Sequence, residues 1–480
     1  GGIHPGEIDG KDAGMMLLRD LTVRGTKRSL LDRANFLFVP ILGVDGHERF
    51  GPHHRSNQRG PEEQGWRTTA RNLNLNRDYA KLDAPEMRAA VRALVAWEPD
   101  LYYDIHVTDG ADYQYDVTWG HNGTHSHSPA SAVWIDAVLT PACARALSDA
   151  GHAPGPLVFP VDDRDLGKGN TAPTFGARYS HGYGDLRHLP TLLVENHSLK
   201  SHERRVLGTY VLLEATLRTL GERGGGLRDA VAKDRARRPA TVPLAWKRRD
   251  GDPPRVLFLG VESRLVLSPI GGGLRVEWSG KPVTMEIPLF VESEPAVTVE
   301  RPRAYWIPPA WPEVIERLAL HGVRMERADA ARTLEVEMLR VVDPLLAPAP
   351  FEGRVPVKAS SFERLRRPET FPAGSTRVPT DQPLGDLAVA LLEPASPDSF
   401  FQWGFFLEIL QQTEYIEPYV IEPTAERMLE RDPALRAEFL RKLEDDAFAR
   451  DPEARRRYFY EKTPYFDARW RLYPVGREAG

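Results

Sequence analysis

Cysteine is almost absent from this sequence of 480 residues, which holds only Cys143. A single cysteine excludes a disulfide within the chain. Because Cys143 lies in the helix-like stretch TPACARALSDAG, we expect a small buried apolar residue there rather than a catalytic thiol.

Long apolar runs and a surplus of positive charge are also missing. No apolar run approaches the ~20 residues that span a bilayer, so we expect no membrane span. The net charge of -5 argues against a nucleic-acid partner, because such proteins carry a basic surplus. The hydrophobic content of 41% and charged content of 27% are those of a globular protein. One core rarely exceeds ~250–300 residues, so we expect two or three domains.

A methionine start and a signal peptide are missing as well. The chain opens on GGIHPGE, which reads as the end of a strand entering a loop. We therefore expect that N-terminal strands are missing and that a signal peptide could have preceded them. On this basis a periplasmic or secreted location is favoured over a cytoplasmic one.

The first 222 residues alternate between strand-like and helix-like segments. FLFVPILG, DLYYDIHV and LPTLLVEN are short apolar runs, whereas DAPEMRAAVRALVAWEP and HERRVLGTYVLLEATLRTLGER have helical spacing. This alternation predicts an α/β domain over 1–222, with helices on both faces of a central sheet.

The remainder of the chain changes character three times. Three glycines and a charged stretch ending in proline predict a linker over 223–239. Short β-like runs such as RVLFLGVE predict a small β-rich accessory domain over 240–345. Residues 346–480 are expected to form a mostly helical C-terminal region, whose aromatic stretch FQWGFFLEILQQTEY favours core or inter-domain packing over a substrate groove.

Three residues of the first domain could hold one metal ion. His4 and Glu7 are three apart in a glycine-flanked turn, and His106 ends the strand DLYYDIHV. Zinc in hydrolases takes three N and O ligands and keeps a fourth position for water. An isolated histidine is usually satisfied by a neighbouring carboxylate, but the combination of His106 with His4 and Glu7 favours a metal site.

Further polar residues could serve such a site. Glu195 follows the apolar run TLLV, where partial burial raises a carboxyl pKa and suits it to proton transfer; helix initiation is the alternative. An arginine beside an amide, as in Asn76-Arg77, can grip a carboxylate. Arg67 could stabilise an oxyanion, although surface ion pairing is the usual role of arginine.

In order, the motifs HPGE, WR, LNLNRDY, DIHV and LLVE resemble those of the zinc carboxypeptidase (M14-type) family, with the resemblance covering about the first 220 residues. The resemblance implies that family's mixed central sheet flanked by helices. It implies one Zn²⁺ per chain on His4, Glu7 and His106. The scissile bond would be a C-terminal peptide bond of a substrate with a free carboxylate.

The resemblance also implies roles for the remaining residues. Glu195 matches the general base that activates the zinc-bound water, and Arg67 matches the arginine that polarises the scissile carbonyl. Asn76 and Arg77 match the pair that anchors the terminal carboxylate. Tyr183 and Tyr179 are candidates for the tyrosine that closes over the substrate, and we choose Tyr183.

The sequence departs from the family pattern at one position and leaves the substrate open. Asn74 stands where many members have an aspartate that orients a zinc histidine; an amide can accept that hydrogen bond but lends no charge. The scaffold also resembles zinc amidases and deacylases that act on cell-wall peptides or N-acyl amino acids. An inactive peptide-binding homologue is the third hypothesis.

Two polar loops could bind ligands of their own. His121, His125 and His127 could form a second metal site, but we favour a polar loop near the rim of the active site. Asp109, Asp112 and Asp116 either attract a cationic group or stabilise turns.

Overall fold

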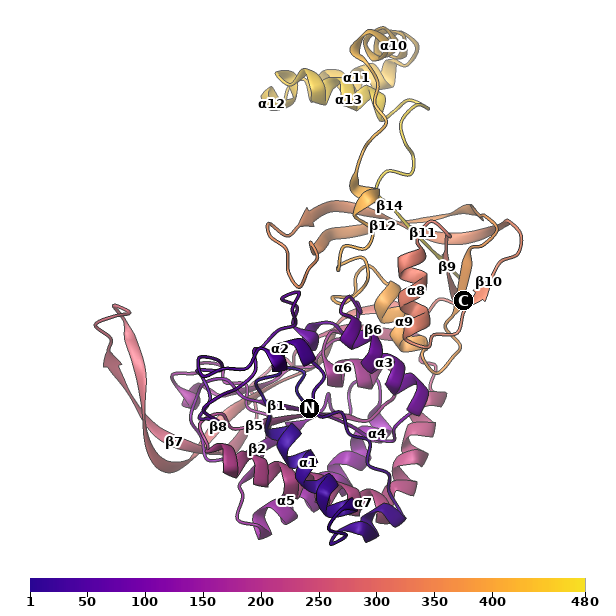
Figure 1. Ribbon diagram of the computed structural model, residues 1–480. Coiled ribbons are helices and arrows are strands. Elements are labelled where there is room, and N and C mark those ends of the chain that lie inside the picture. Colours follow the sequence, from indigo (N-terminus) through magenta and orange to yellow (C-terminus); the bar gives the residue numbers. More distant parts are fainter. Residues whose placement is uncertain (480) are drawn as a thin grey trace.

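A computed structural model describes residues 1–479 (Figure 1). The helices are α1 (Asp9–Thr22), α2 (Val44–Glu48), α3 (Pro85–Trp97), α4 (Pro129–Trp134), α5 (Thr140–Asp149), α6 (Ser180–Leu186), α7 (His202–Ala236), α8 (Pro312–Leu320), α9 (Gly385–Leu392), α10 (Pro418–Arg431), α11 (Pro433–Lys442), α12 (Asp446–Ala449) and α13 (Pro452–Tyr460). The strands are β1 (Tyr102–Val107), β2 (Val117–Gly120), β3 (Pro154–Pro156), β4 (Asn170–Ala172), β5 (Thr191–Asn196), β6 (Thr241–Arg248), β7 (Arg255–Leu267), β8 (Leu274–Glu300), β9 (Ala304–Ile307), β10 (Glu326–Arg327), β11 (Arg332–Leu346), β12 (Val357–Phe371), β13 (Thr376–Pro379) and β14 (Leu472–Glu478).

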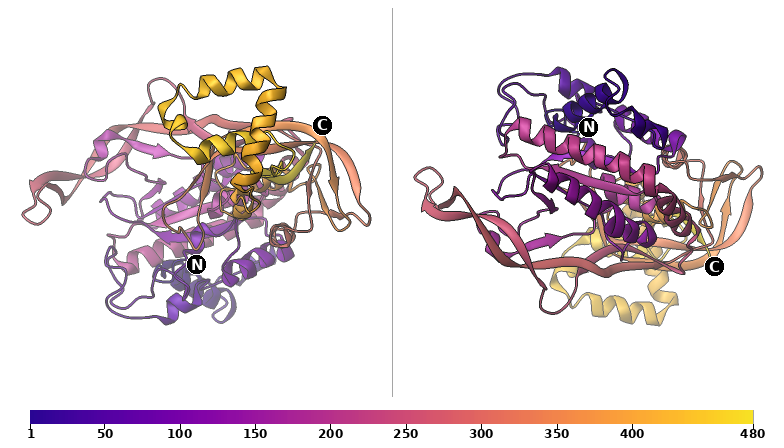
Figure 2. Two further views of the ribbon diagram at one scale, coloured as in Figure 1. Left: turned by 90° about the horizontal axis from the view of Figure 1, so that it is seen from above. Right: turned by 90° about the horizontal axis from the view of Figure 1, so that it is seen from below.

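The first half of the chain is built on a mixed sheet in the order β1-β5-β2-β3. β1 and β5 are parallel, β2 is antiparallel to β5, and β3 is parallel to β2. Helices α1 and α7 pack on one face and α6 on the other (Figures 1 and 2). The expected α/β fold with a mixed central sheet between helices is therefore present.

The period of two along β1 divides its side chains between two environments. Ile105 points into the core beneath α1 and α7, where it meets Leu17 and Leu212. Asp104 and His106 alternate with it and so lie on the opposite face. This alternation sets an apolar layer beneath the sheet and leaves polar side chains on the face that carries α6.

The expected linker over 223–239 is wrong, because α7 continues without a break to Ala236. Packing overrides the weak helix propensity of the glycines: a Cβ on Gly226 would meet Trp134 Nε1 at 3.1 Å. Near the end of α7, buried Asp234 accepts hydrogen bonds from the backbone of Ala130 and Ser131 at 3.0 and 2.8 Å. These bonds satisfy free donors at the start of α4 and fix the two helices together.

The expected boundary at residue 345 also fails, because a six-stranded sheet crosses it. Its order is β10-β13-β9-β14-β11-β12, and β11 pairs with β12 along almost their full length. The last strand, β14, inserts between β9 and β11. Residues 346–480 were expected to be mostly helical, yet they supply three of the six strands.

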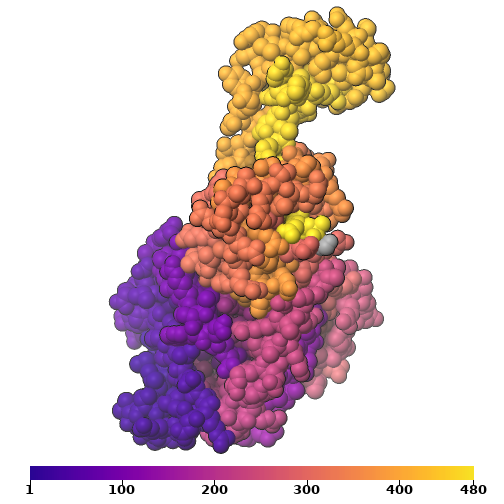
Figure 3. All heavy atoms as spheres, turned by 90° about the vertical axis from the view of Figure 1, so that its right-hand side faces the viewer, coloured from indigo at the N-terminus to yellow at the C-terminus, as the bar shows by residue number. Residues whose placement is uncertain are grey.

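Two parts project from this body. β7 and β8 form a long hairpin that leaves the body on one side (Figure 1), and the inner part of β8 also pairs with β4 and β6. Helices α10–α13 form a separate group with its own small core, joined to the rest by a narrow neck (Figure 3). The aromatic stretch preceding them behaves as expected: Phe400, Phe401 and Trp403 are buried in the main core.

One helical stretch, Pro129–Asp149, is long and apolar enough by length and composition to cross a membrane, contrary to the expectation that no segment would be. It joins α4 and α5 through a π-helical turn, Ile135–Leu139. Its Leu139, Cys143 and Leu147 are buried against the core that α7 completes, which is the place of a core helix in a globular protein. Cys143 is wholly buried, as expected.

Candidate metal centre

The turn that carries His4 and Glu7 is closed by a hydrogen bond from the Glu7 N–H to the His4 carbonyl at 2.8 Å. Gly6, between them, has no room for a side chain: a Cβ there would lie 2.5 Å from the Gly65 carbonyl oxygen. The turn therefore directs the imidazole and the carboxylate to the same side, at the start of α1.

His106 and Glu195 come from neighbouring parallel strands. They are register partners near the carboxyl ends of β1 and β5, where ligands of α/β sheets gather. One ligand atom each of His4, Glu7 and His106 lies within 4.8 Å of the others, and all three residues are buried. The structure thus brings together the three residues that the sequence proposed for the metal.

Each of the three side chains is held by a further polar contact. His4 Nε2 lies 2.9 Å from Asn74 Oδ1, the contact expected of the amide that replaces the family's aspartate. His106 Nε2 lies 2.8 Å from Asp104 Oδ2. Glu7 accepts from Arg55 Nη2 at 2.7 Å and from the Val107 N–H at 3.0 Å.

These outer contacts leave the Nδ1 atoms of the two histidines facing each other. His106 Nδ1 is 3.2 Å from His4 Nδ1 and 2.9 Å from Glu7 Oε2. When both Nδ1 atoms are unprotonated, these nitrogens and the carboxylate repel one another, and a cation among them removes the repulsion. A set of two imidazoles and one carboxylate suits zinc, so the donors fit the metal that the sequence resemblance implies.

Burial and charge shift the ionisation of this cluster strongly. Burial disfavours the charged forms, but His4 and His106 outweigh it and hold the pKa of Glu7 well below its usual range. For His106, the carboxylates of Asp104 and Glu7 likewise outweigh burial and hold its pKa well above the ordinary value. For His4, burial lowers the pKa, and the positive charges of His106 and Arg67 add to this effect while Glu7 opposes it.

Glu195 differs from the other carboxylates of the site. Burial raises its pKa to about 8, and the negative charges of Glu7 and Asp104 add to the shift. Its Oε2 atom is buried and has no hydrogen-bond partner among residues 1–479. A carboxylate with a raised pKa and an unused oxygen is suited to accept and return a proton.

The three polar residues assigned to substrate and oxyanion lie close to this cluster. Arg67 Nη1 is 3.5 Å from Glu7 Oε1, and its side chain is 37% exposed. Asn76 is buried, with Nδ2 3.5 Å from His106 Nε2. The guanidinium of Arg77 lies over the ring of Tyr179, 4.6 Å from its centroid. Arg67 is thus partly exposed beside Glu7, whereas Asn76 is buried beside His106.

Tyr183, chosen from the sequence as the tyrosine over the substrate, lies elsewhere. It is 1% exposed, and its hydroxyl contacts His321 Nδ1 at 2.9 Å and accepts from Arg187 Nη1 at 2.7 Å. Tyr179 caps α6, and Tyr183 one turn later faces the core between the two halves of the chain. Of the two candidates, Tyr179 is the one beside Arg77.

Two residues at this centre were missed by the sequence reasoning, Asp104 and Arg55. Asp104 had a usable signal, because a side chain two residues before His106 in a strand must share its face. Arg55 had none: it lies in a loop 48 positions from Glu7 in the sequence, and only the fold brings the two together.

The histidine loop does not gather a second metal site within the described residues 1–479. His121 pairs with Asp136 at 2.9 Å, and His125 Nε2 lies 2.6 Å from Thr174 Oγ1. His127 Nδ1 contacts Asp386 at 3.2 Å. Each ring thus has a polar partner of its own.

The aspartates that follow β1 mostly stabilise structure. Asp116 is buried and forms two hydrogen bonds with Arg204 at 2.6 and 2.7 Å. Asp112 contacts His197 Nε2 at 3.1 Å. Asp109 is exposed.

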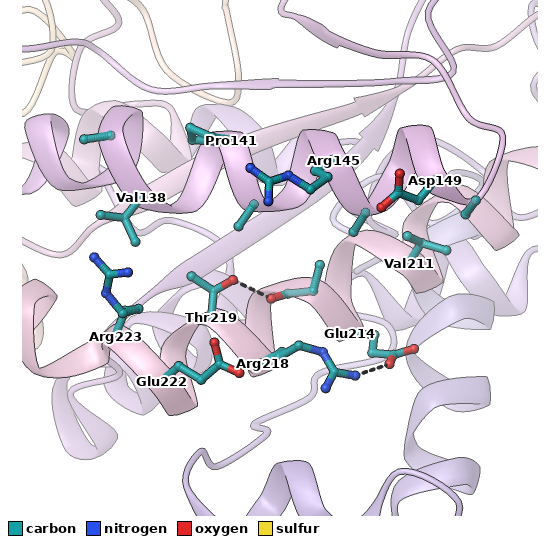
Figure 4. A pocket seen from close by; sticks show the side chains of 15 residues that line it. Val138, Pro141, Arg145, Asp149, Val211, Glu214, Arg218, Thr219, Glu222 and Arg223 are labelled. Carbon is teal, nitrogen blue, oxygen red and sulfur yellow. Dashed lines mark hydrogen bonds and ion pairs between the residues drawn. The ribbon is translucent and has the colours of Figure 1, made fainter.

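One surface groove lies apart from the metal centre. The groove in Figure 4 runs between α5 and α7 and contains none of the site residues; Arg218 and Glu214 form an ion pair within it. A smaller cavity lies nearer, because Tyr179 forms part of its wall together with Phe175 and Trp246.

Two histidines, a glutamate and a second carboxylate of raised pKa on a mixed α/β sheet are an arrangement typical of metallohydrolases. Comparison with known proteins narrows this class. Residues 1–137 match the model of the zinc carboxypeptidase family.

Relatives match over different lengths of the chain. Carboxypeptidase 2 of Trichophyton rubrum is 23% identical over 424 residues, covering 84% of this chain and 72% of the relative. Carboxypeptidase 2 of Trichophyton tonsurans is 36% identical over 118 residues, 24% of this chain and 22% of that protein. A metallo-carboxypeptidase structure from Burkholderia cenocepacia aligns with a TM-score of 0.33 and 21% identity, over 45% of this chain and 56% of that one.

Proposed function

We propose that this protein is a zinc-dependent metallocarboxypeptidase that hydrolyses the C-terminal peptide bond of a substrate with a free carboxylate. The observation that carries the proposal is the convergence of His4, Glu7 and His106 within 4.8 Å, beside a Glu195 oxygen with no partner in residues 1–479. One Zn²⁺ per chain would be held by these three side chains.

The roles of the residues follow from their positions. Bound zinc would supply a Lewis acid that polarises a carbonyl and acidifies water. Glu195 takes a proton from the attacking water, which its raised pKa favours, and returns it to the leaving nitrogen. Arg67 is exposed enough to reach a substrate and stabilises the oxyanion that develops on the carbonyl.

The terminal carboxylate of the substrate is assigned to Asn76 and Arg77. The guanidinium of Arg77 is held against the Tyr179 ring, so its orientation is fixed before substrate arrives. A planar guanidinium binds a carboxylate with two parallel hydrogen bonds. This pair would place the scissile bond next to Glu195.

The test compares the wild type with Glu195→Gln, using blocked dipeptides with a free or an amidated C-terminus. We expect Glu195→Gln to retain about one zinc per chain and to lose roughly 10²–10⁴-fold in kcat, because only the proton acceptor is removed. Zinc is measured by elemental analysis and hydrolysis by mass spectrometry. The exposed Glu203→Gln on α7 is the matched control and should keep full activity.

Four outcomes would contradict the proposal. Full activity of Glu195→Gln would remove Glu195 as the base. Equal cleavage of amidated and free substrates would contradict recognition of a carboxylate. If the wild type cleaves N-acyl amino acids or cell-wall peptides but no ordinary peptide, a zinc deacylase or amidase replaces the carboxypeptidase, and if it cleaves nothing, a binding protein does.

A further inference from the structure

Asp104 is a buried carboxylate for which the proposed mechanism has no use. It is 3% exposed and lies on β1, two residues before His106 and on the same face of the strand. Burying a carboxylate is costly unless an opposite charge or hydrogen bonds compensate. Its position therefore needs a reason.

The partner of Asp104 is the far nitrogen of His106. Asp104 Oδ2 lies 2.8 Å from His106 Nε2, which is within hydrogen-bond distance. The angle between the two groups lies outside the range of a formed hydrogen bond. The other polar group near Nε2 is Asn76 Nδ2 at 3.5 Å. An amide N–H and a protonated Nε2 are both donors, so Asp104 is the group that can accept the Nε2 proton.

The contact between Asp104 and His106 Nε2 determines which nitrogen of His106 can bind a metal. With its proton on Nε2 and directed to Asp104, the ring presents the Nδ1 lone pair towards Glu7 and His4, 2.9 and 3.2 Å away. Carboxylates bonded to the far nitrogen of a metal-binding histidine fix its tautomer and increase its basicity.

The two histidines of the centre are supported unequally. His4 Nε2 has the neutral amide of Asn74 at 2.9 Å, whereas His106 Nε2 has the carboxylate of Asp104. Asn74 Oδ1 also accepts the Asn76 N–H at 2.9 Å, which fixes its oxygen towards His4. The amide of Asn74 gives His4 no negative charge, whereas the carboxylate of Asp104 places a negative charge beside the His106 ring.

We propose that Asp104 is a positioning residue of the metal site, whose carboxylate holds the Nε2 proton of His106, directs Nδ1 to the metal, and supplies the outer charge that Asn74 does not. This inference rests on the proposed metal site. It assigns Asp104 no contact with substrate.

Metal affinity tests the inference directly. Zinc is titrated in competition with a chromophoric chelator into the wild type, Asp104→Asn and the double variant Asn74→Asp/Asp104→Asn. We expect Asp104→Asn to bind zinc about 10–100-fold more weakly, since outer partners of metal histidines have effects of this size. The double variant, which returns a carboxylate to His4, should recover part of the loss.

Asp116→Asn is the control for removing a buried aspartate whose carboxylate pairs with Arg204 and not with a candidate metal ligand. Asp116 is 1% exposed and pairs with Arg204, so its loss should lower stability without changing zinc affinity. If Asp104→Asn binds zinc as tightly as the wild type, or no more weakly than Asp116→Asn, the inference is overturned while the proposed function stands. A wild type that binds no zinc overturns both.

A measurement on the wild type covers the case in which Asp104→Asn does not fold. In ¹⁵N-labelled protein loaded with zinc, the His106 ring should carry its proton on Nε2 and coordinate through Nδ1. A ring protonated on Nδ1, or coordinating through Nε2, would contradict the role of Asp104.

Discussion

The C-terminal half and the β7–β8 hairpin differ in how they contact the catalytic layer. This layer is defined here as the sheet β1-β5-β2-β3 with its helices, which carries the candidate metal centre. The C-terminal half meets the catalytic layer along a seam of buried and half-buried polar contacts, defined here by the pairs Asn74–Glu352, Asp83–Arg354, His127–Asp386, Arg178–Asp398 and Tyr183–His321. The outer hairpin instead exposes Leu265, Leu267, Ile270 and Leu274 to solvent. The seam thus consists of contacts with the catalytic layer, whereas the hairpin tip presents exposed apolar side chains.

The seam reaches the proposed metal centre through one residue. The Asn74 N–H donates to Glu352 Oε2 at 2.7 Å, and the side chain of Asn74 contacts His4. The main core is also shared, since Tyr79 and Leu82 of the first half pack in one cluster with Trp403 and Phe406. Glu352 of the C-terminal half is therefore linked through Asn74 to the candidate ligand His4.

The largest difference between the seam and the hairpin should be a loss of stability at low pH that is caused by His321 of the seam. His321 Nε2 donates to the Ala80 carbonyl at 3.0 Å, and Nδ1 accepts from the Tyr183 hydroxyl. Burial lowers its pKa to about 3, so the folded protein keeps the ring neutral. The unfolded chain takes up a proton below about pH 6.5, and stability falls by about 1.4 kcal/mol for each further pH unit towards pH 3.

We therefore expect His321→Asn to lower stability at pH 7 but to flatten its decline between pH 6.5 and 4.5, relative to the wild type. Urea unfolding across that range measures the difference in slope, which should approach one proton. The exposed His53→Asn should follow the wild type. Parallel pH profiles for His321→Asn and the wild type would show that the seam does not hold this ring neutral.

A smaller effect is expected from Glu352→Gln, which weakens the link between the seam and Asn74. The Asn74 N–H can still donate to the amide oxygen of the introduced glutamine, but this acceptor carries no charge. The hydrogen bond should therefore weaken, because charged hydrogen bonds are roughly twice as strong as neutral ones. Zinc affinity should fall by less than about tenfold, because Glu352 acts through Asn74 and not on a ligand directly. Chelator competition measures this, with the exposed Glu335→Gln of β11 as the control. A zinc affinity equal to that of the control would show that the seam contributes to stability but not to metal binding.

Sequence patterns predicted the catalytic layer better than the seam, for a physical reason. His4, Glu7 and His106 stand in local motifs at a turn and a strand end, and the fold brings them together as the motifs indicated. Tyr183 was misplaced because the sequence does not reveal which side of a short helix faces a second half of the chain.

The linker and the boundary at 345 failed for the same reason. Three glycines indicate flexibility locally, but in α7 Gly226 packs against Trp134, and Asp234 fixes the end of the helix to α4. The six-stranded sheet joins β9 to β14 across more than 160 residues, and no local pattern encodes such a pairing. Long-range contacts thus account for most of what the sequence left undetermined.

The smallest effect should come from the hairpin tip. Leu267 pairs with Leu274, and Leu265 pairs with Val276, so these side chains form an apolar face on one side of the ribbon. Replacing Leu265, Leu267 and Leu274 by threonine keeps β-propensity while removing the exposed apolar surface. We expect the free energy of unfolding to change by no more than about 0.5 kcal/mol per substitution and kcat/KM to stay unchanged, as for exposed surface positions in general. A loss of several kcal/mol, or of activity, would mean that the hairpin face is covered in solution, and the contrast with the seam would then disappear.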